Sequence, residues 1–463
     1  MPTRSRPFPA FRPSLPLILL FILLATLWVA GGASRPDAAG QVVVRAVTAA
    51  VLATAILFCR RPALRRRAPT WLLLAAALMA TLQLVPLPPA LWEALPGRAP
   101  FSGAAAVLGE APVWRPWSIV PGATVNALAS LIVPVTTLVL LASAEPEDLA
   151  RLPGLLLAFA VLSTLLGLLQ FSGGAFNNPF LNDTPGTVSS SFANRNHLAL
   201  FLAMGCLLVP VWVFARGWRP GWRVPTGIGL GLLFALTILA TGSRAGTALG
   251  ALAIAIGLVI AWRGIKASLA RYPRWVIYAF TAGIIGVIAI AVLLSIAADR
   301  AVSVDRVLAV DQELDMRSRG FPVVLAMVRE YFPMGSGLGG FDPLFRMHEP
   351  FGLLKPTFFN HAHNDFLEIV LDTGVFGLLL LLAALGWWVW ASARAWRAGW
   401  GPERMLPRLG SALLLLVMLA SIVDYPARTP MMMAVIVIAA VWLDGVSPDV
   451  HRASALPGEG QPL

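Results

Sequence analysis

The sequence has few charged residues. Asp, Glu, Lys and Arg together make up 13% of the 463 residues, whereas a soluble domain carries about 25%. Hydrophobic residues make up 58%, and the mean hydropathy is +0.76. This composition leaves too little polar surface to cover water-soluble globules, and it is too apolar for an intrinsically disordered chain. We therefore predict an all-α polytopic membrane protein.

Cysteine and lysine are also scarce. The two cysteines, Cys59 and Cys206, both lie in apolar runs, which excludes a disulfide framework and a cysteine-based metal site. All but two of the 35 basic residues are arginine, and the formal net charge is +12. A basic balance can indicate nucleic-acid binding, but here the charges are dispersed between apolar runs. That distribution is typical of loops that orient membrane spans, so we expect no nucleic-acid partner.

The apolar runs predict about twelve transmembrane helices, since a helix needs roughly 20 apolar residues to cross a bilayer. The predicted spans are 14–32, 41–59, 70–86, 124–143, 153–171, 197–215, 226–242, 245–262, 275–297, 365–391, 409–424 and 429–445.

Basic residues concentrate in alternate connections between these spans, which predicts that both termini are cytoplasmic. We expect nine spans with short loops in residues 1–297, a long periplasmic loop at 298–364, three spans in 365–445 and a short cytoplasmic tail at 446–463. A polar stretch as long as 298–364 is uncommon unless it is functional. Segments 87–123 and 172–196 are predicted on the same face as this loop.

His361 and His363 end the long loop, just before an apolar run. Asp365 and Glu368 have capping-box spacing, which predicts a helix that starts near Asp365 with Asp365 as its cap. The positive end of that helix would lower the pKa of His363 and leave a neutral imidazole available as a base. Two other interpretations stay open. Both histidines can be ordinary interfacial loop residues, or they can bind a metal with further ligands, which the neighbouring sequence does not offer.

Four arginines are predicted at the same membrane face. Arg195 begins the sixth span, Arg244 lies in the tight link between the seventh and eighth, and Arg317 and Arg319 belong to the long loop. Taken singly, each is typical of a cationic side chain that reaches from a span to the interface. Taken together with His363, they favour an anionic site, because arginine can grip a diphosphate with two parallel hydrogen bonds.

The glycines Gly335, Gly337 and Gly340 fit the pattern G-x-G-x-x-G. A dinucleotide site would require a preceding strand and a following helix in a βαβ unit. Here the pattern lies in a periplasmic loop and is followed by Phe341–Asp342–Pro343. We expect instead a tight bend that returns the loop toward the membrane.

Several stretches resemble the O-antigen ligase/O-antigen polymerase superfamily of bacterial membrane proteins. The family signature is His, then Asn, Ser or Gln, nine residues, Gly, two residues, and Gly, Thr or Tyr. It is matched by His363–Asn364, Gly374 and Gly377. Further family-like stretches are Phe192–Ala199, Arg317 through Pro333 to Phe341, and Gln83–Pro88 with Trp92. The resemblance covers roughly residues 70–445.

The resemblance implies a GT-C-like fold and a metal-independent, inverting glycosyl transfer at the periplasmic face of the bacterial inner membrane, without a cofactor. The donor would be a glycan on undecaprenyl diphosphate, and the acceptor a lipid A–core or another glycan. His363 matches the family's essential histidine, and Arg195 an arginine proposed to hold the diphosphate. Arg317 fits the family's loop arginine better than Arg319, since an aromatic residue, Phe321, follows four positions later.

Other residues would have supporting roles in this reaction, with Arg244 as a weaker diphosphate ligand. The supporting residues are Asn364, Asn196, Gly374 and Gly377. A polymerase that uses a lipid-linked repeat as acceptor is the first alternative. A transporter is the second, but transport sites usually lie near the middle of the membrane, and Arg45 is the one basic residue within a predicted span.

Overall fold

A computed structural model describes most of the chain. The described residues are 13–60, 62, 68–173, 178–181, 187–214, 221–270, 273, 275, 278, 312–354 and 359–445. Two predictions lie largely outside these residues: the ninth span, 275–297, and the tail, 446–463. Parts of the predicted loops 172–196 and 298–364 lie outside them as well.

The described chain is almost entirely helical. Its first half contains α1 (Leu15–Ala30), α2 (Ala39–Phe58), α3 (Ala68–Leu82), α4 (Pro89–Glu93), α5 (Ala99–Val107), α6 (Pro121–Ser130), α7 (Ile132–Ser143), α8 (Pro146–Leu149), α9 (Leu152–Phe171) and α10 (Arg195–Phe214). Its second half contains α11 (Arg223–Ala240), α12 (Arg244–Leu269), α15 (Gln312–Tyr331), α16 (Phe341–His348), α17 (Asp365–Arg397), α18 (Met405–Ser421) and α19 (Pro430–Asp444), with the short 3-10 turns η1 (Phe351–Leu353), η2 (Pro402–Arg404) and η3 (Pro426–Arg428). Strands β1 (Pro86–Leu87) and β2 (Arg115–Pro116) pair antiparallel, Pro86 opposite Pro116.

Seven helical segments of the described chain are long and apolar enough to cross a membrane. They are Ala39–Phe58, Pro121–Ser143, Pro146–Phe171, Arg195–Phe214, Arg223–Ala240, Arg244–Leu269 and Asp365–Arg397. Four shorter apolar helices, α1, α3, α18 and α19, complete the set. These eleven segments coincide with eleven of the predicted spans. The prediction of an all-α polytopic membrane protein is therefore confirmed in its class, while the total of twelve spans and the GT-C-like topology stay predictions.

Helix α10 lies at the centre of the bundle. Almost all of its side chains are buried, and it packs against α9, α11, α12 and α18. Helices α1, α18 and α19 contribute most of the remaining buried leucine, valine and methionine side chains. A helix that is apolar all round is expected in such a central position. The first residues of α10 are thereby held firmly where they meet the candidate site.

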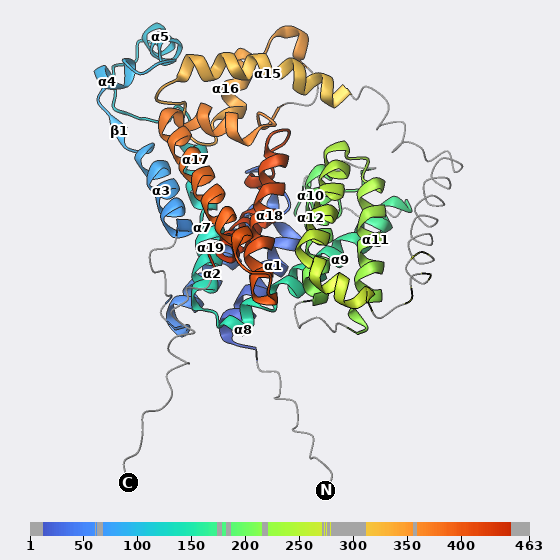
Figure 1. The fold of residues 1–463 in the computed structure, drawn as a ribbon. Coiled ribbons are helices and arrows are strands. Elements are labelled where there is room, and N and C mark those ends of the chain that lie inside the picture. Colours follow the sequence, from blue (N-terminus) through green and yellow to red (C-terminus); the bar gives the residue numbers. More distant parts are fainter. Residues whose placement is uncertain are drawn as a thin grey trace, which may run out of the picture.

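The polar segments gather at one end of the bundle (Figure 1). There α15 and α16 form an outer layer, and α4 and α5 lie beside them. Segment 87–123 is joined to the loop after α15, because Arg98 donates to the carbonyl of Gly335 and the Ile119 amide donates to that of Ser336. The described parts of segments 87–123 and 298–364 therefore share one end of the molecule.

The start of α17 differs in one detail from the sequence prediction. The helix does begin at Asp365, but its cap is Asn364, whose side-chain oxygen accepts a hydrogen bond from the Leu367 amide at 3.0 Å. The prediction that Asp365 caps the helix was wrong. The Asp365 side chain turns instead into the protein, where it accepts from Ser421 and Arg428. Asparagine and aspartate are equally good caps, so tertiary contacts decided between them.

Candidate functional site

A buried carboxylate, Asp424, lies at the centre of the candidate site. It follows α18 and is 3% exposed. One of its oxygens, Oδ2, accepts hydrogen bonds from the side-chain amides of Asn194 at 3.2 Å and Asn196 at 2.7 Å. The other, Oδ1, accepts from the Tyr425 amide at 3.0 Å and lies 3.3 Å from Nδ1 of His363. Asp424 thus joins α10, α18 and the start of α17 at one point.

His363 lies in the turn directly before α17. Its backbone adopts a left-handed conformation, with φ of 50°, which costs a non-glycine residue about 1–2 kcal/mol. Such conformations are concentrated at functional sites because the surrounding structure must enforce them. Burial lowers the pKa of the imidazole, although the hydrogen bond to Asp424 partly opposes this. The ring is therefore neutral at pH 7, and with Nδ1–H donating to Asp424 its Nε2 is the basic nitrogen.

Asp424 is ionised in this setting. Burial acts to raise its pKa, but the hydrogen bond with His363 and the interactions with His197 and Arg317 outweigh it, so the pKa lies well below its usual range. A carboxylate behind an imidazole fixes the ring's tautomer and stabilises the imidazolium that forms when the ring takes a proton. The pair thus has the arrangement of a general base with its orienting acid.

The two candidate loop arginines have different hydrogen-bond partners. Arg317 lies at the start of α15, where it donates to the carbonyl of Val423 at 3.0 Å and approaches Oδ2 of Asp424 to 3.7 Å. Arg319 donates to the carbonyl of Gly352 at 3.0 Å. The structure brings Arg317 to the same carboxylate as His363 and directs Arg319 toward the turn after α16.

The predicted residues on α10 and α12 meet through a hydrogen bond. The Ser243 hydroxyl donates to the side-chain oxygen of Asn196 at 2.7 Å, and Asn196 in turn donates to Asp424. Arg195 is the first residue of α10, and Arg244 is the first residue of α12. Both arginines therefore lie at helix N-termini one residue away from side chains that connect to Asp424. Helix N-termini and guanidinium groups both attract anions.

A second histidine stands next to the first. His361 Nδ1 lies 2.9 Å from Oε1 of Glu368, and its Nε2 lies 3.1 Å from the Ser34 hydroxyl. Its ring is 4.4 Å from that of Tyr425, which is also 4.9 Å from the ring of His363. Burial raises the pKa of the Tyr425 phenol, which keeps it neutral. The tyrosine therefore serves as a spacer between the two imidazoles.

Behind the histidines lies a buried ionic cluster. Arg428 contacts three carboxylates of α17: Asp365 at 3.1 Å, Glu368 at 3.0 Å and Asp372 at 3.8 Å. Burial acts to lower the pKa of Arg428, but the three carboxylates outweigh it and raise the pKa above its ordinary value. The cluster fixes the first turns of α17 to η3 and so sets the distance between His363 and Asp424.

The local geometry explains why the two signature positions, 374 and 377, are glycine. α17 is broken at Gly374, which has φ of 60°, and a Cβ there would lie 1.9 Å from the Pro333 carbonyl oxygen. A Cβ on Gly377 would lie 1.7 Å from the Thr373 hydroxyl. Only glycine fits both positions without moving the neighbouring atoms. Neither glycine contacts His363, so their part in the site is to shape the helix that carries it.

The loop after α15 replaces the hydrogen bonds that this break removes. The amides of Ser336 and Gly337 donate to the carbonyls of Leu371 and Asp372, and the Val375 amide donates to the carbonyl of Pro333. Carbonyl groups at a break in a helix need such hydrogen-bond partners when they are buried. The glycine-rich loop thus makes the tight bend toward the membrane helices that its sequence predicts.

Asp424 and Arg428 are residues of the candidate site that the sequence analysis did not identify. Asp424 falls at the end of a predicted span, where an acid is costly and therefore informative. Asp365, Glu368 and Asp372 are spaced i, i+3 and i+7, which places all three on one helix face and calls for a buried cation. Among the residues that the structure describes, no group of three or more His, Cys, Asp or Glu side chains is arranged to hold a metal ion.

Two comparisons with known proteins bear on this site. An O-antigen ligase family model matches residues 229–382, a stretch that contains Arg317, His363, Gly374 and Gly377. The exopolysaccharide production protein ExoQ of Rhizobium meliloti (strain 1021) is 28% identical over 245 residues, which is 51% of this chain and 53% of the relative. The chain therefore spans about half the length of the curated relative it matches. Together with the complete signature at His363, the two matches support the assignment of this chain to the O-antigen ligase/polymerase superfamily.

Proposed function

We propose that the protein is a membrane glycosyltransferase of the O-antigen ligase/polymerase type. It transfers a glycan from undecaprenyl diphosphate to a hydroxyl of lipid A–core or a similar acceptor at the periplasmic face of the inner membrane. The observation that carries this proposal is the placement of His363 and Arg317 on the same buried carboxylate, Asp424. A base and a guanidinium side by side suit a reaction that removes a proton and releases a diphosphate.

The reaction is a direct displacement. Nε2 of His363 takes the proton of the acceptor hydroxyl while that oxygen forms a bond to the anomeric carbon of the donor. The bond between the anomeric carbon and the diphosphate oxygen breaks, and undecaprenyl diphosphate leaves with the electron pair. Because attack and departure occur on opposite sides, the configuration of the sugar inverts. Asp424 stabilises the imidazolium that results.

The leaving diphosphate gains negative charge as the bond breaks. Arg317 is the guanidinium with the clearest position for stabilising this charge, and Arg195 and Arg244 stand at the neighbouring helix N-termini. Preorganised donors of this kind contribute about 10²–10³-fold each to a rate. Arg319 has a different neighbourhood, at Gly352, and we assign it a smaller role.

A polymerase is the alternative that a specific observation favours. The matched relative is an exopolysaccharide production protein, and a polymerase would use a second lipid-linked saccharide in place of lipid A–core. The same base and the same guanidinium would serve both acceptors. The two activities therefore differ in the acceptor that reaches His363, and the test must vary the acceptor.

The test uses purified protein in liposomes with an undecaprenyl diphosphate-linked saccharide as donor. Product on added lipid A–core indicates a ligase, and lengthening of the lipid-linked saccharide indicates a polymerase. Movement of the intact lipid-linked saccharide across the liposome membrane without any new glycosidic bond would contradict both and indicate a transporter.

The role of His363 is tested by His363→Ala with His348→Ala as its matched control. General-base help contributes about 10²–10⁴-fold, so His363→Ala is expected to lose nearly all transfer. His348 pairs with Glu330 on the outer layer, and its substitution is expected to leave transfer within about twofold. Normal transfer by a folded His363→Ala protein would refute the proposed base.

A further inference from the structure

His197 is a buried histidine that the proposed reaction does not use. It lies in the first turn of α10, two residues after Arg195, and is 2% exposed. Its Nε2 is 3.9 Å from Oδ1 of Asp424, and its ring stands edge-on to that of Tyr425, with the centroids 5.3 Å apart. The same carboxylate oxygen lies 3.3 Å from Nδ1 of His363. One oxygen of Asp424 therefore stands between two imidazoles.

Neither ring nitrogen of His197 has a hydrogen-bond partner among the residues that the structure describes. The distance of 3.9 Å to Asp424 is too long for a direct hydrogen bond, since such bonds span about 2.7–3.2 Å. A buried polar group without a partner is rare in native proteins and indicates a catalytic role or a bound water or ion. Polar groups separated by more than about 3.5 Å are often bridged by water. The position of His197 therefore indicates a small ligand between it and Asp424.

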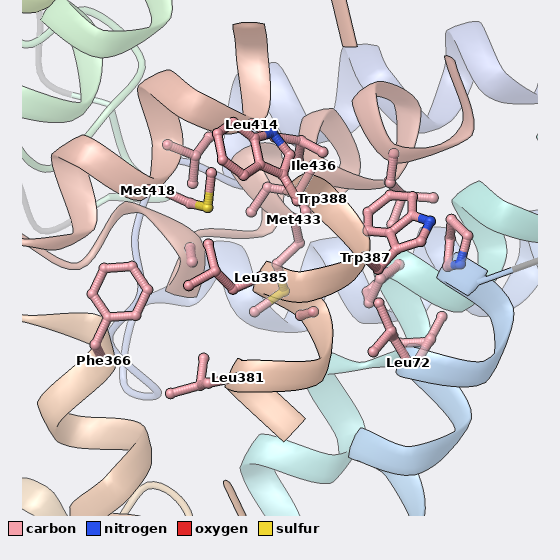
Figure 2. Close-up of a pocket in the computed structure, with 18 of the residues that line it drawn as sticks. Leu72, Phe366, Leu381, Leu385, Trp387, Trp388, Leu414, Met418, Met433 and Ile436 are labelled. Atoms are coloured by element: carbon pink, nitrogen blue, oxygen red, sulfur yellow. The ribbon is translucent and has the colours of Figure 1, made fainter. Parts of the chain in front are cut away.

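A small cavity lies next to this pair. It has a volume of about 10 Å³ and is lined by Asn196, His197 and Asp424 together with apolar residues, among them residues of α12 and α18. A cavity needs about 10–15 Å³ to hold one water molecule, and it needs polar groups in its wall to bind that water. The larger pocket in Figure 2 differs in this respect, because Leu385, Met418 and the side chains around them are almost all apolar. The small cavity fits a single water in both size and polarity.

We propose that this cavity binds one ordered water molecule that joins His197 to Asp424, and that His197 is a positioning residue for the base His363, an inference that rests on the proposed glycosyl transfer. Nε2–H of His197 donates to the water, and the water donates to Oδ1 of Asp424. The side-chain amides of Asn194 and Asn196 hold the other oxygen, Oδ2, directly. Both oxygens of the carboxylate are then fixed from α10, and Oδ1 keeps its orientation toward His363.

The water also keeps the charge on the carboxylate. Asp424 must stay ionised while His363 carries the proton of the acceptor, because a neutral acid would not stabilise the imidazolium. Each donor to Oδ1 favours the charged form of Asp424, and the interaction with His197 acts to lower the pKa of this carboxyl. His197 itself is almost fully buried, so we expect kcat to depend on it and KM to stay unchanged.

The experiment compares two substitutions of His197 that preserve different properties. His197→Phe keeps an aromatic ring against Tyr425 but has no donor, whereas His197→Gln keeps an N–H donor and loses the ring. We expect kcat for glycan transfer to fall about tenfold in His197→Phe and less than about threefold in His197→Gln, with KM unchanged in both. If His197 served only to pack against Tyr425, the order of the two variants would be reversed, and that result would overturn the positioning role.

A second pair of variants tests the water and leaves the histidine in place. Ala420→Val adds methyl groups at the wall of the cavity and is expected to displace the water, with a loss of kcat of about tenfold as in His197→Phe. Ala412→Val is the matched control, because Ala412 is also buried on α18 but lines a different pocket. It should leave kcat unchanged. Wild-type kcat in a folded Ala420→Val protein, or an equal loss in Ala412→Val, would contradict the inference.

An experimental structure that shows ordered waters separates failure of this inference from failure of the proposed function. Density for one water in contact with both His197 and Asp424 supports the site even if no glycan transfer is found. A direct hydrogen bond between His197 and Asp424, or a cavity without density, refutes the water site even if transfer is active. A water that is present while His197→Phe transfers at the wild-type rate refutes the positioning role.

Discussion

The carboxylate of Asp424 is the most direct point at which to test the site. Asp424→Asn keeps the side-chain shape but removes the charge that faces His363 at 3.3 Å and Arg317 at 3.7 Å. A hydrogen bond to a charged group contributes about 1.5–3 kcal/mol, and about 1.4 kcal/mol corresponds to tenfold in rate. We therefore predict that kcat falls by roughly tenfold to a hundred-and-fifty-fold, because the imidazolium loses its counter-charge in the transition state.

The same substitution changes the pH dependence in a defined direction. His363 must be neutral to accept a proton, so the rate falls on the acid side as the ring becomes protonated. The carboxylate of Asp424 acts to raise the pKa of His363, against the burial that lowers it. Without the carboxylate the pKa falls further, so the acid limb of kcat/KM moves to lower pH.

The assay is the pH profile of glycan transfer in liposomes, with Asp342→Asn as control. Asp342 forms an exposed pair with Arg346, and such pairs contribute about 1 kcal/mol or less, so this variant should match the wild type. A purely structural role for Asp424 would reduce the amount of folded protein without moving the acid limb. A limb that stays in place or moves to higher pH in folded Asp424→Asn would refute the reasoning.

Three further predictions concern neighbouring features. Arg317→Ala is expected to lower kcat about 10²-fold or more, while Arg319→Ala stays within about tenfold, both measured by transfer; equal losses would contradict the assignment. Gly374→Ala is expected to lower the melting temperature, since a left-handed φ costs a non-glycine residue about 1–2 kcal/mol and a Cβ meets a carbonyl. Gly386→Ala, with open space at that position, should not lower it. Arg428→Met should destabilise the protein by about 3–5 kcal/mol, because it leaves buried carboxylates unpaired; an unchanged melting temperature would argue against the cluster.

The helices and the signature could be predicted from the sequence because both are local. Long apolar runs predict spans from their length alone, and the described helices follow these runs closely. The preference for Arg317 over Arg319 came from the family resemblance, in which an aromatic residue follows the arginine by four positions. The choice of Asn364 over Asp365 as helix cap could not be predicted. The Asp365 side chain instead accepts hydrogen bonds from Ser421 and Arg428, which are distant in the sequence.

The partners of His363 could not be predicted because they come from another part of the chain. Asp424 is separated from His363 by 61 positions, and only the packing of α17 against α18 brings them together. Sequence periodicity predicts which face of a helix is buried, but it does not say which helix covers that face. The position of Asp424 at the end of an apolar run was the available signal, because a buried carboxylate in such a place needs a cation or a hydrogen-bond donor as partner.

The break at Gly374 divides α17 into two parts with different contacts. Above the break, the backbone is held by the loop at 333–337, and the side chains of Asp365, Glu368 and Asp372 are fixed by Arg428. Below it, the helix continues as a long apolar segment to Arg397. The helical hydrogen bonds at the break are replaced by those of the loop, so we expect a tilt of the lower part to be absorbed at Gly374. We therefore expect the position of His363 to be insensitive to movements of the apolar part of α17 in the membrane.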